Sequence, residues 1–132
     1  MALNFKFSEL LYSKTAEERG ISNIPDKESA NNILELIVLC LQPIRDKLKR
    51  PIIITSGYRS PELNKIIGGV NSSQHCKGQA ADIKVNGMRA DELANFIHNS
   101  GVEYDQLIVE YDSWVHISFC KGKNRKIRLI IS

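Results

Sequence analysis

The chain has 132 residues, 42% of them hydrophobic, which is enough for one domain with a buried core. Its formal net charge of +3 is too small to indicate a nucleic-acid-binding protein, and its three widely spaced cysteines suggest neither a disulfide framework nor a zinc knuckle. The sequence has no apolar run long enough for a membrane span and no signal-peptide pattern at its start. We therefore expect a single domain over residues 1–132, made in the cytoplasm without a signal peptide. We expect no nucleic-acid or membrane partner, and the sequence does not determine the oligomeric state.

The first part of the chain is predicted to be helical. Residues 7–20 offer short helical pieces, with Ser8 and Thr15 as possible caps. A long helix should begin after Asp26, because hydrophobic residues then recur at helical spacing to about residue 48. Pro43 should kink or divide this helix, since proline lacks the backbone N–H that a helix interior uses.

The remainder predicts strands mixed with shorter helices. A buried strand over 52–55 leads into a loop that carries Tyr58 and Arg59, and a short helix follows over 60–69. Further along, the patterns indicate a strand over 80–85, a helix over 89–101, a hairpin of strands over 105–111 and 114–119, and a last strand over 126–132. The predicted fold class is α+β, with early helices packed on a mainly antiparallel sheet.

Two histidines and an aspartate suggest a metal site. His75 precedes one predicted strand, Asp82 lies within it, and His116 lies within another. Catalytic zinc takes three such ligands and leaves a fourth position for water. The interval from His75 to Asp82 is too long for one helical face, but Gly78 would let the loop reverse. On spacing alone, hydrogen-bonded core histidines remain the alternative.

Three stretches in the same order resemble a known family. The pattern Ser-x-His-x-x-Gly-x-Ala-x-Asp occupies residues 73–82, follows "SGYR" at 56–59 and precedes "WVH" at 114–116. Together they resemble the zinc D-alanyl-D-alanine carboxypeptidase family, which includes phage L-alanyl-D-glutamate endopeptidases and shares its fold with the hedgehog signalling domain. The resemblance covers most of the chain and is strongest to small phage and prophage members.

This resemblance implies a zinc metallopeptidase that hydrolyses peptide bonds in bacterial peptidoglycan stem peptides, as a carboxypeptidase or an endopeptidase. One Zn²⁺ would be held by His75, Asp82 and His116. The protein would reach the cell wall after release from the cell or as part of a phage particle. A non-catalytic, zinc-containing cell-wall-binding module of the same fold is the alternative function, and a metal-free structural protein is a further one.

The general base is not settled by the resemblance. Several relatives carry a carboxylate three residues before the last histidine, where this chain has Ser113. Glu110 resembles the glutamate of the closest subgroup and is the preferred candidate, with Asp112 as the alternative base. If Asp112 and Ser113 formed a strict two-residue turn, Glu110 would face away from His116. The preferred assignment therefore requires a bulged or longer connection.

Other candidate residues surround the metal site. Arg59 resembles the family arginine that leans over the metal, where its guanidinium could hold a substrate carboxylate or the charge on the carbonyl oxygen. Ser73, Tyr58 and Gln106 are candidate substrate-binding residues, with loop capping or bracing as their alternative roles. Trp114 should pack beneath the site, because it is two residues from His116 on the same strand face.

Overall fold

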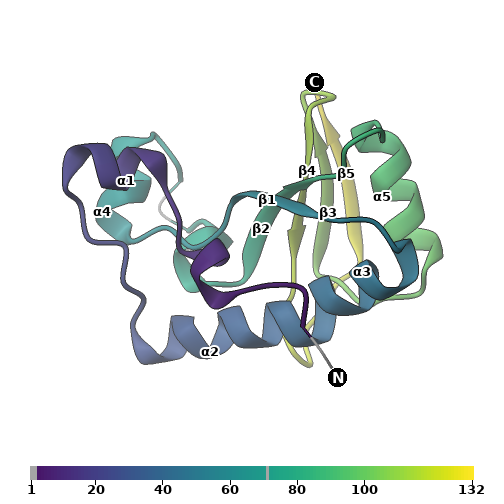
Figure 1. Ribbon diagram of the computed structural model, residues 1–132, viewed down its shortest axis with the longest axis horizontal. Helices are drawn as coiled ribbons and strands as arrows, with labels where there is room; N and C mark the ends of the chain where they lie inside the picture. Colours follow the sequence, from purple (N-terminus) through teal and green to yellow (C-terminus); the bar gives the residue numbers. More distant parts are fainter. Residues whose placement is uncertain (1–2, 71) are drawn as a thin grey trace.

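The computed structural model describes residues 3–70 and 72–132, and it has the predicted α+β class (Figure 1). The helical elements are η1 (Phe7–Leu10), α1 (Lys14–Arg19), α2 (Lys27–Leu36), η2 (Ile37–Leu41), α3 (Gln42–Leu48), α4 (Pro61–Ile66), η3 (Gln74–Lys77) and α5 (Ala90–Asn99). The strands are β1 (Ile53–Ser56), β2 (Ala80–Lys84), β3 (Gln106–Glu110), β4 (Trp114–Ser118) and β5 (Ile127–Ile131). Within the described residues, no helix combines the length and hydrophobicity of a membrane span.

The caps of the first helices differ from the prediction. Ser13, not Thr15, caps α1, and its side chain accepts a hydrogen bond from the Ala16 backbone N–H. Lys6, not Ser8, occupies the N-cap position of η1. Asp26 caps α2 as predicted, accepting from the Ser29 backbone N–H at 2.8 Å. The errors lie where several serine and threonine residues compete within a few positions.

Pro43 changes the helix type instead of breaking the helix. The segments α2, η2 and α3 follow one another from Lys27 to Leu48, and η2 is a π-helical stretch. The Gln42 backbone N–H donates to the Ile37 carbonyl five residues earlier, which widens the helix immediately before Pro43. A π-bulge is a known way to accommodate such a disturbance.

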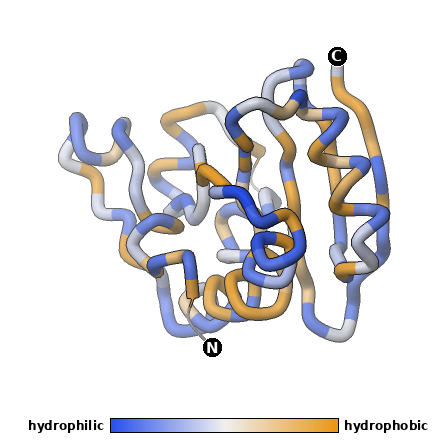
Figure 2. The backbone as a smooth tube through the Cα atoms, turned by 45° about the vertical axis from the view of Figure 1, so that its right-hand side comes forward, coloured by the Kyte–Doolittle hydropathy of each residue, from blue (hydrophilic) through white to orange (hydrophobic). Residues whose placement is uncertain are grey.

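Five strands form one sheet in the order β1-β2-β4-β3-β5. The pairs β1/β2, β2/β4 and β3/β4 are antiparallel, and the last pair confirms the predicted hairpin. Strand β5 pairs with β3 in parallel and forms one edge of the sheet. Its hydrophobic residues near the C-terminus appear as an orange stretch in Figure 2.

The sheet has a buried face and an open face. On the buried face, alternate residues of the central strands join one hydrophobic core with α2, η2, α3 and α5; they are Ala81, Ile83, Leu107, Val109, Val115 and Ile117. In Figure 1, α5 lies beside β5, and α1 and α4 lie together at the far end beyond β1. Because strand side chains alternate between faces, Asp82 and His116 point to the open face.

Candidate metal centre

His75 is positioned by the short helix η3 and its two caps. The Ser73 side chain accepts a hydrogen bond from the His75 backbone N–H at 3.2 Å, so Ser73 caps the turn. Gly78 ends the turn in the left-handed conformation, with φ of 74°, as the sequence predicted. The chain then reverses directly into β2, which carries Asp82.

Asp82 and His116 face each other across the sheet. They are register partners in the antiparallel pair of β2 and β4, and both side chains lie on the open face. A register shift in β1 between Ile54 and Ser56 places Ser56 opposite Asp82. Such a β-bulge bends the strand next to a site and here directs β1 into the loop that carries Arg59.

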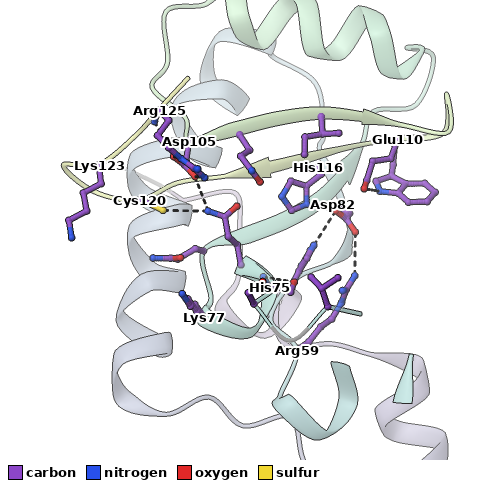
Figure 3. A pocket seen from close by; sticks show the side chains of 18 residues that line it. Arg59, His75, Lys77, Asp82, Asp105, Glu110, His116, Cys120, Lys123 and Arg125 are labelled. Carbon is purple, nitrogen blue, oxygen red and sulfur yellow. Dashed lines mark hydrogen bonds and ion pairs between the residues drawn. The ribbon is translucent and has the colours of Figure 1, made fainter. Parts of the chain in front are cut away.

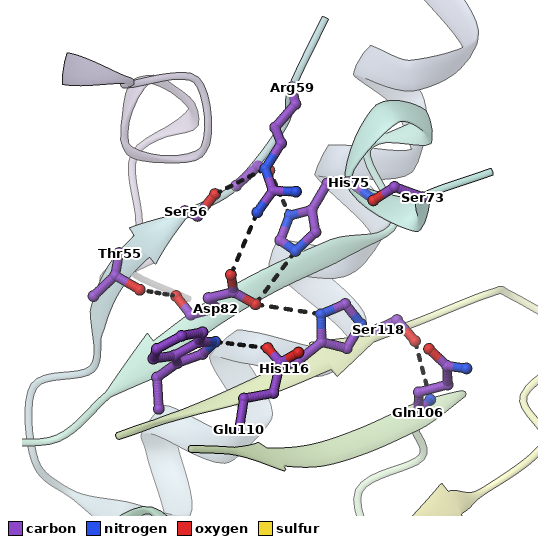
Figure 4. A network of polar contacts seen from close by, with 12 residues as sticks. Thr55, Ser56, Arg59, Ser73, His75, Asp82, Gln106, Glu110, His116 and Ser118 are labelled. Carbon is purple, nitrogen blue, oxygen red and sulfur yellow. Dashed lines mark hydrogen bonds and ion pairs between the residues drawn. The ribbon is translucent and has the colours of Figure 1, made fainter. Parts of the chain in front are cut away.

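Two of the candidate ligands, His75 and His116, meet at one carboxylate oxygen of the third, Asp82 (Figure 4). Asp82 Oδ1 lies 3.3 Å from His75 Nε2 and 3.2 Å from His116 Nδ1. In a tetrahedral zinc site with bonds of about 2.1 Å, neighbouring ligand atoms are about 3.4 Å apart. All three ligand atoms lie within 4.8 Å of one another, and all three residues are buried. The donor set therefore fits a divalent metal ion.

The tautomer of His75 strengthens this fit. Its Nδ1 lies 2.7 Å from the Gly57 carbonyl oxygen, which can only accept, so Nδ1 carries the hydrogen in the neutral ring. The lone pair of Nε2 then faces Asp82 Oδ1. Two acceptors at 3.3 Å repel each other unless a proton or a metal ion lies between them.

Asp82 remains ionised at neutral pH. Burial alone would raise the pKa of its carboxyl, but a hydrogen bond from His116 and the adjacent His75 imidazole lower the pKa well below the ordinary value. The group therefore offers an anionic oxygen ligand, which is the form that a metal ion requires.

Backbone contacts couple the Arg59 loop to His75. The Arg59 backbone N–H donates to the His75 carbonyl at 3.1 Å, and the Gly57 carbonyl accepts from the His75 ring. The Arg59 guanidinium lies 3.7 Å from Asp82 Oδ2 and also contacts Ser56 Oγ. The Arg59 side chain is 18% exposed, so its cationic group reaches the open face above the metal centre.

Glu110 lies on the same face as His116. The connection between β3 and β4 contains three residues, 111–113, so that Glu110 pairs with Trp114 and Ile108 pairs with His116. Tyr111 and Asp112 have positive φ values of 53° and 52°, as in a type I′ turn, and Ser113 is the extra residue. This is the longer connection that the assignment of Glu110 required. Glu110 Oε2 accepts a hydrogen bond from Trp114 Nε1 at 2.7 Å.

The remaining candidates separate into two groups. Ser73 and Gln106 line the same cleft as the metal centre. Asp112 is exposed in the turn and lies outside the residues that line this cleft, which makes it the weaker candidate base. Tyr58 is 5% exposed and lines a separate hollow with Tyr12 and Leu63, so its position suits a bracing role. The catalytic and substrate-binding roles themselves stay predictions.

The metal centre occupies one part of an open cleft of about 850 Å³ (Figure 3). Arg59, Glu110 and Trp114 line it together with the three candidate ligands. Another part of the cleft was not predicted from the sequence: there Gln74 donates to Asp105 at 2.8 Å, and Arg125 makes a two-bond ion pair with Asp105. The position of Gln74 next to His75 was the available signal, but its partners are 31 and 46 residues away.

Comparison with known families agrees with this geometry. The family model described as Peptidase M15 matches residues 3–118. The chain belongs to the peptidase M15 family. No curated protein matches the chain. The matched segment contains the three candidate ligands together with Arg59 and Glu110 and ends where β4 ends.

Membership in the M15 family places the chain among the metallopeptidases. The buried group of His75, Asp82 and His116 is where this M15 chain could hold its metal ion. Cys76 is adjacent to His75 in sequence but lies outside that group. Strand β5 and the turn that precedes it lie beyond the matched segment, although that turn contributes to the cleft.

Proposed function

We propose that this chain is a zinc-dependent peptidase that hydrolyses peptide bonds in the stem peptides of bacterial peptidoglycan. The observation that carries the proposal is the meeting of two imidazole nitrogens at one oxygen of Asp82, in an open cleft that also contains Glu110 and Arg59. Two histidines and one aspartate are a donor set that suits catalytic zinc. The substrate class follows from the sequence resemblance to cell-wall peptidases.

Zinc held by these three residues would supply a Lewis acid and lower the pKa of a coordinated water to about 7. Glu110 then acts as the general base: it takes the proton from the attacking water and returns it to the leaving amine nitrogen. The Trp114 indole fixes Glu110 Oε2 at 2.7 Å and leaves Oε1 for the proton. The hydrogen bond therefore orients the base without using both of its oxygens.

Arg59 is suited to binding negative charge in the cleft. Hydrogen bonds to Ser56 and Asn64 hold its guanidinium, which lies beside Asp82 Oδ2. A fixed guanidinium can bind a substrate carboxylate or the charge that develops on the carbonyl oxygen.

The sequence resemblance to cell-wall peptidases also supports a phage or prophage origin. The protein would then reach the cell wall after release from the cell or as part of a phage particle.

The test is the release of peptides from purified peptidoglycan, followed by mass spectrometry. We expect defined fragments from the wild type and at least a 100-fold lower rate from Glu110→Gln, with unchanged zinc content. Asp112→Asn is the matched control and should retain the wild-type rate, because Asp112 lies outside the cleft lining. Loss of activity in Asp112→Asn alone would contradict the assignment of the base.

A zinc-containing chain that releases no fragment would contradict the peptidase proposal. That outcome would favour the alternative of a cell-wall-binding module. The masses of the fragments would distinguish carboxypeptidase from endopeptidase cleavage.

A further inference from the structure

The cleft continues past the metal centre to a second polar end. This far end is formed by Gln74, Lys77, Asp105, Cys120, Lys123 and Arg125. Figure 3 shows Lys77 and Lys123 on one side of the cleft, with Arg59 and Glu110 on the other. Three elements build the far end: η3, the start of β3 and the turn between β4 and β5. None of these residues is used by the proposed hydrolysis.

The far end carries excess positive charge. Arg125 is neutralised, because its guanidinium makes two hydrogen bonds of 2.8 Å to the buried Asp105 carboxylate. Within residues 3–70 and 72–132, neither Lys77 nor Lys123 makes an ion pair. Lys121, from the same turn as Lys123, pairs with Glu35 at 3.9 Å and does not line the cleft. The ammonium groups of Lys77 and Lys123 are therefore available to a ligand bound at the far end.

Gln74 adds an unused hydrogen-bond acceptor. Its side-chain nitrogen donates to Asp105 Oδ2 at 2.8 Å, which fixes the orientation of the amide. Gln74 Oε1 is then buried and has no hydrogen-bond partner among the described residues. A buried acceptor without a donor is unfavourable, so this oxygen favours a ligand that brings an N–H group.

The distance between the two ends is that of a few peptide residues. Ile108 pairs with His116, and Asp105 precedes Ile108 by three residues. At about 3.4 Å per residue along a strand, the far end lies about 10 Å from the metal centre. An extended substrate advances by a similar distance per residue, so the far end reaches two or three residues from the cleaved bond.

We propose that the far end is a specificity subsite for an acidic residue of the substrate, two or three residues from the cleaved bond. The substrate carboxylate lies between Lys77 and Lys123, and a backbone N–H of the same peptide donates to Gln74 Oε1. The inference rests on the proposed peptidase function, because it needs the peptide to lie along the cleft from the metal centre.

The test measures binding, so that it does not depend on turnover. The zinc-loaded Glu110→Gln variant is titrated calorimetrically with synthetic pentapeptides in which each position in turn is glutamate or glutamine. At one position we expect glutamate to bind about five- to tenfold more tightly, as two partly exposed ion pairs would give. Adding Lys77→Gln and Lys123→Gln should reduce this preference below twofold. Lys121→Gln is the matched control and should leave it unchanged.

The acceptor is tested separately. Gln74→Leu should weaken the binding of both peptides by about tenfold and leave the charge preference in place. Unchanged affinity in this variant would overturn the role of Gln74. Raising the salt concentration from 0.05 to 0.5 M should reduce the charge preference, because exposed charges are screened.

The outcomes for the subsite and for the peptidase are distinguishable. Wild-type cleavage of stem peptides with no position that favours glutamate would overturn the subsite and leave the peptidase proposal standing. A charge preference that requires both lysines, with no cleavage by the wild type, would show that the far end binds an acidic residue and would overturn the peptidase proposal. Circular dichroism of each variant identifies any that fails to fold, and the single lysine variants then provide the same comparison.

Discussion

Asp105→Asn tests how the far wall of the cleft is held. The Asp105 side chain is 1% exposed, and its carboxylate accepts from the Arg125 backbone N–H, from Arg125 Nε and Nη2, and from the Gln74 amide. These bonds attach the turn between β4 and β5 to η3, the element that carries His75. Asparagine has nearly the same shape, so the substitution changes hydrogen bonding with little change in packing.

The expected loss in the free energy of unfolding follows from the hydrogen bonds that Asp105→Asn removes. Asparagine keeps one acceptor oxygen for the Arg125 backbone N–H and Nε, but its amide nitrogen meets two donors, Arg125 Nη2 and Gln74 Nε2. Both of these hydrogen bonds to the ionised carboxylate are lost, and donors are brought face to face. At about 1.5 kcal/mol each, we expect the free energy of unfolding to fall by about 3 kcal/mol at pH 7.

The effect should depend on pH. Hydrogen bonds from the Arg125 side chain lower the pKa of Asp105 from 3.8 to about 2, against the opposing effect of burial. A depressed folded-state pKa contributes stability above the unfolded value, and this stability is lost as pH falls from about 4 to 2. Allowing for the exposure of Arg125, the loss in the wild type is about 1 to 2 kcal/mol. The asparagine variant lacks this titration.

Urea unfolding of the wild type and of Asp105→Asn at pH 7 and pH 3 checks the prediction. The difference between their free energies of unfolding should be smaller at pH 3 than at pH 7. Asp91→Asn is a suitable control, since its ion pair with Arg89 is exposed and should change stability little. A loss below 1 kcal/mol at pH 7, or a gap that does not change with pH, would refute the reasoning.

Two further substitutions test the metal centre and its base. Gly78→Ala should reduce both zinc affinity and thermal stability, because a Cβ would lie 2.4 Å from the Ser29 carbonyl oxygen. Gly101→Ala is the control, because Gly101 has a similar positive φ but an added Cβ there meets no described atom within 4 Å. Gly101→Ala should lower the free energy of unfolding by about 1 kcal/mol, and Gly78→Ala should lower it by at least about 2 kcal/mol more. Equal losses in differential scanning calorimetry would contradict the steric argument. Trp114→Phe removes the indole donor to Glu110 and should lower kcat about tenfold at unchanged zinc content, whereas an unchanged kcat would show that the hydrogen bond does not orient the base.

Much of the fold could be predicted because hydrophobic periodicity is a local signal. The helical spacing before Pro43 and the alternation on either side of the hairpin turn give the long helix and the hairpin of β3 and β4. The parallel pairing of β5 with β3 could not be predicted, since the short turn before β5 is equally compatible with antiparallel pairing. Contacts between segments distant in sequence decide which strand β5 pairs with.

The turn between β3 and β4 likewise depends on contacts that are distant in sequence. Tyr111 and Asp112 adopt positive φ without being glycine, a conformation that local propensity disfavours. It is held by a hydrogen bond of 2.7 Å from the Tyr111 backbone N–H to the Ile131 carbonyl and by the Tyr111 ring beside Trp114. The C-terminal strand therefore helps to fix the face on which Glu110 lies, which the hairpin sequence alone does not reveal.

The candidate ligands were accessible from sequence for a different reason. His75 and Asp82 share one motif, and the register of β2 and β4 brings His116 opposite Asp82. The far end of the cleft has no such motif, because Gln74, Asp105 and Arg125 meet only in the folded chain.

The most direct test of the central claim is a zinc titration of the metal-free chain, in which bound zinc and stem-peptide cleavage are measured in the same samples. We predict that cleavage rises with bound zinc and saturates at one ion per chain. His116→Ala should neither retain zinc nor cleave. Cleavage that is independent of zinc, or full zinc binding by His116→Ala, would contradict the assignment of the metal centre.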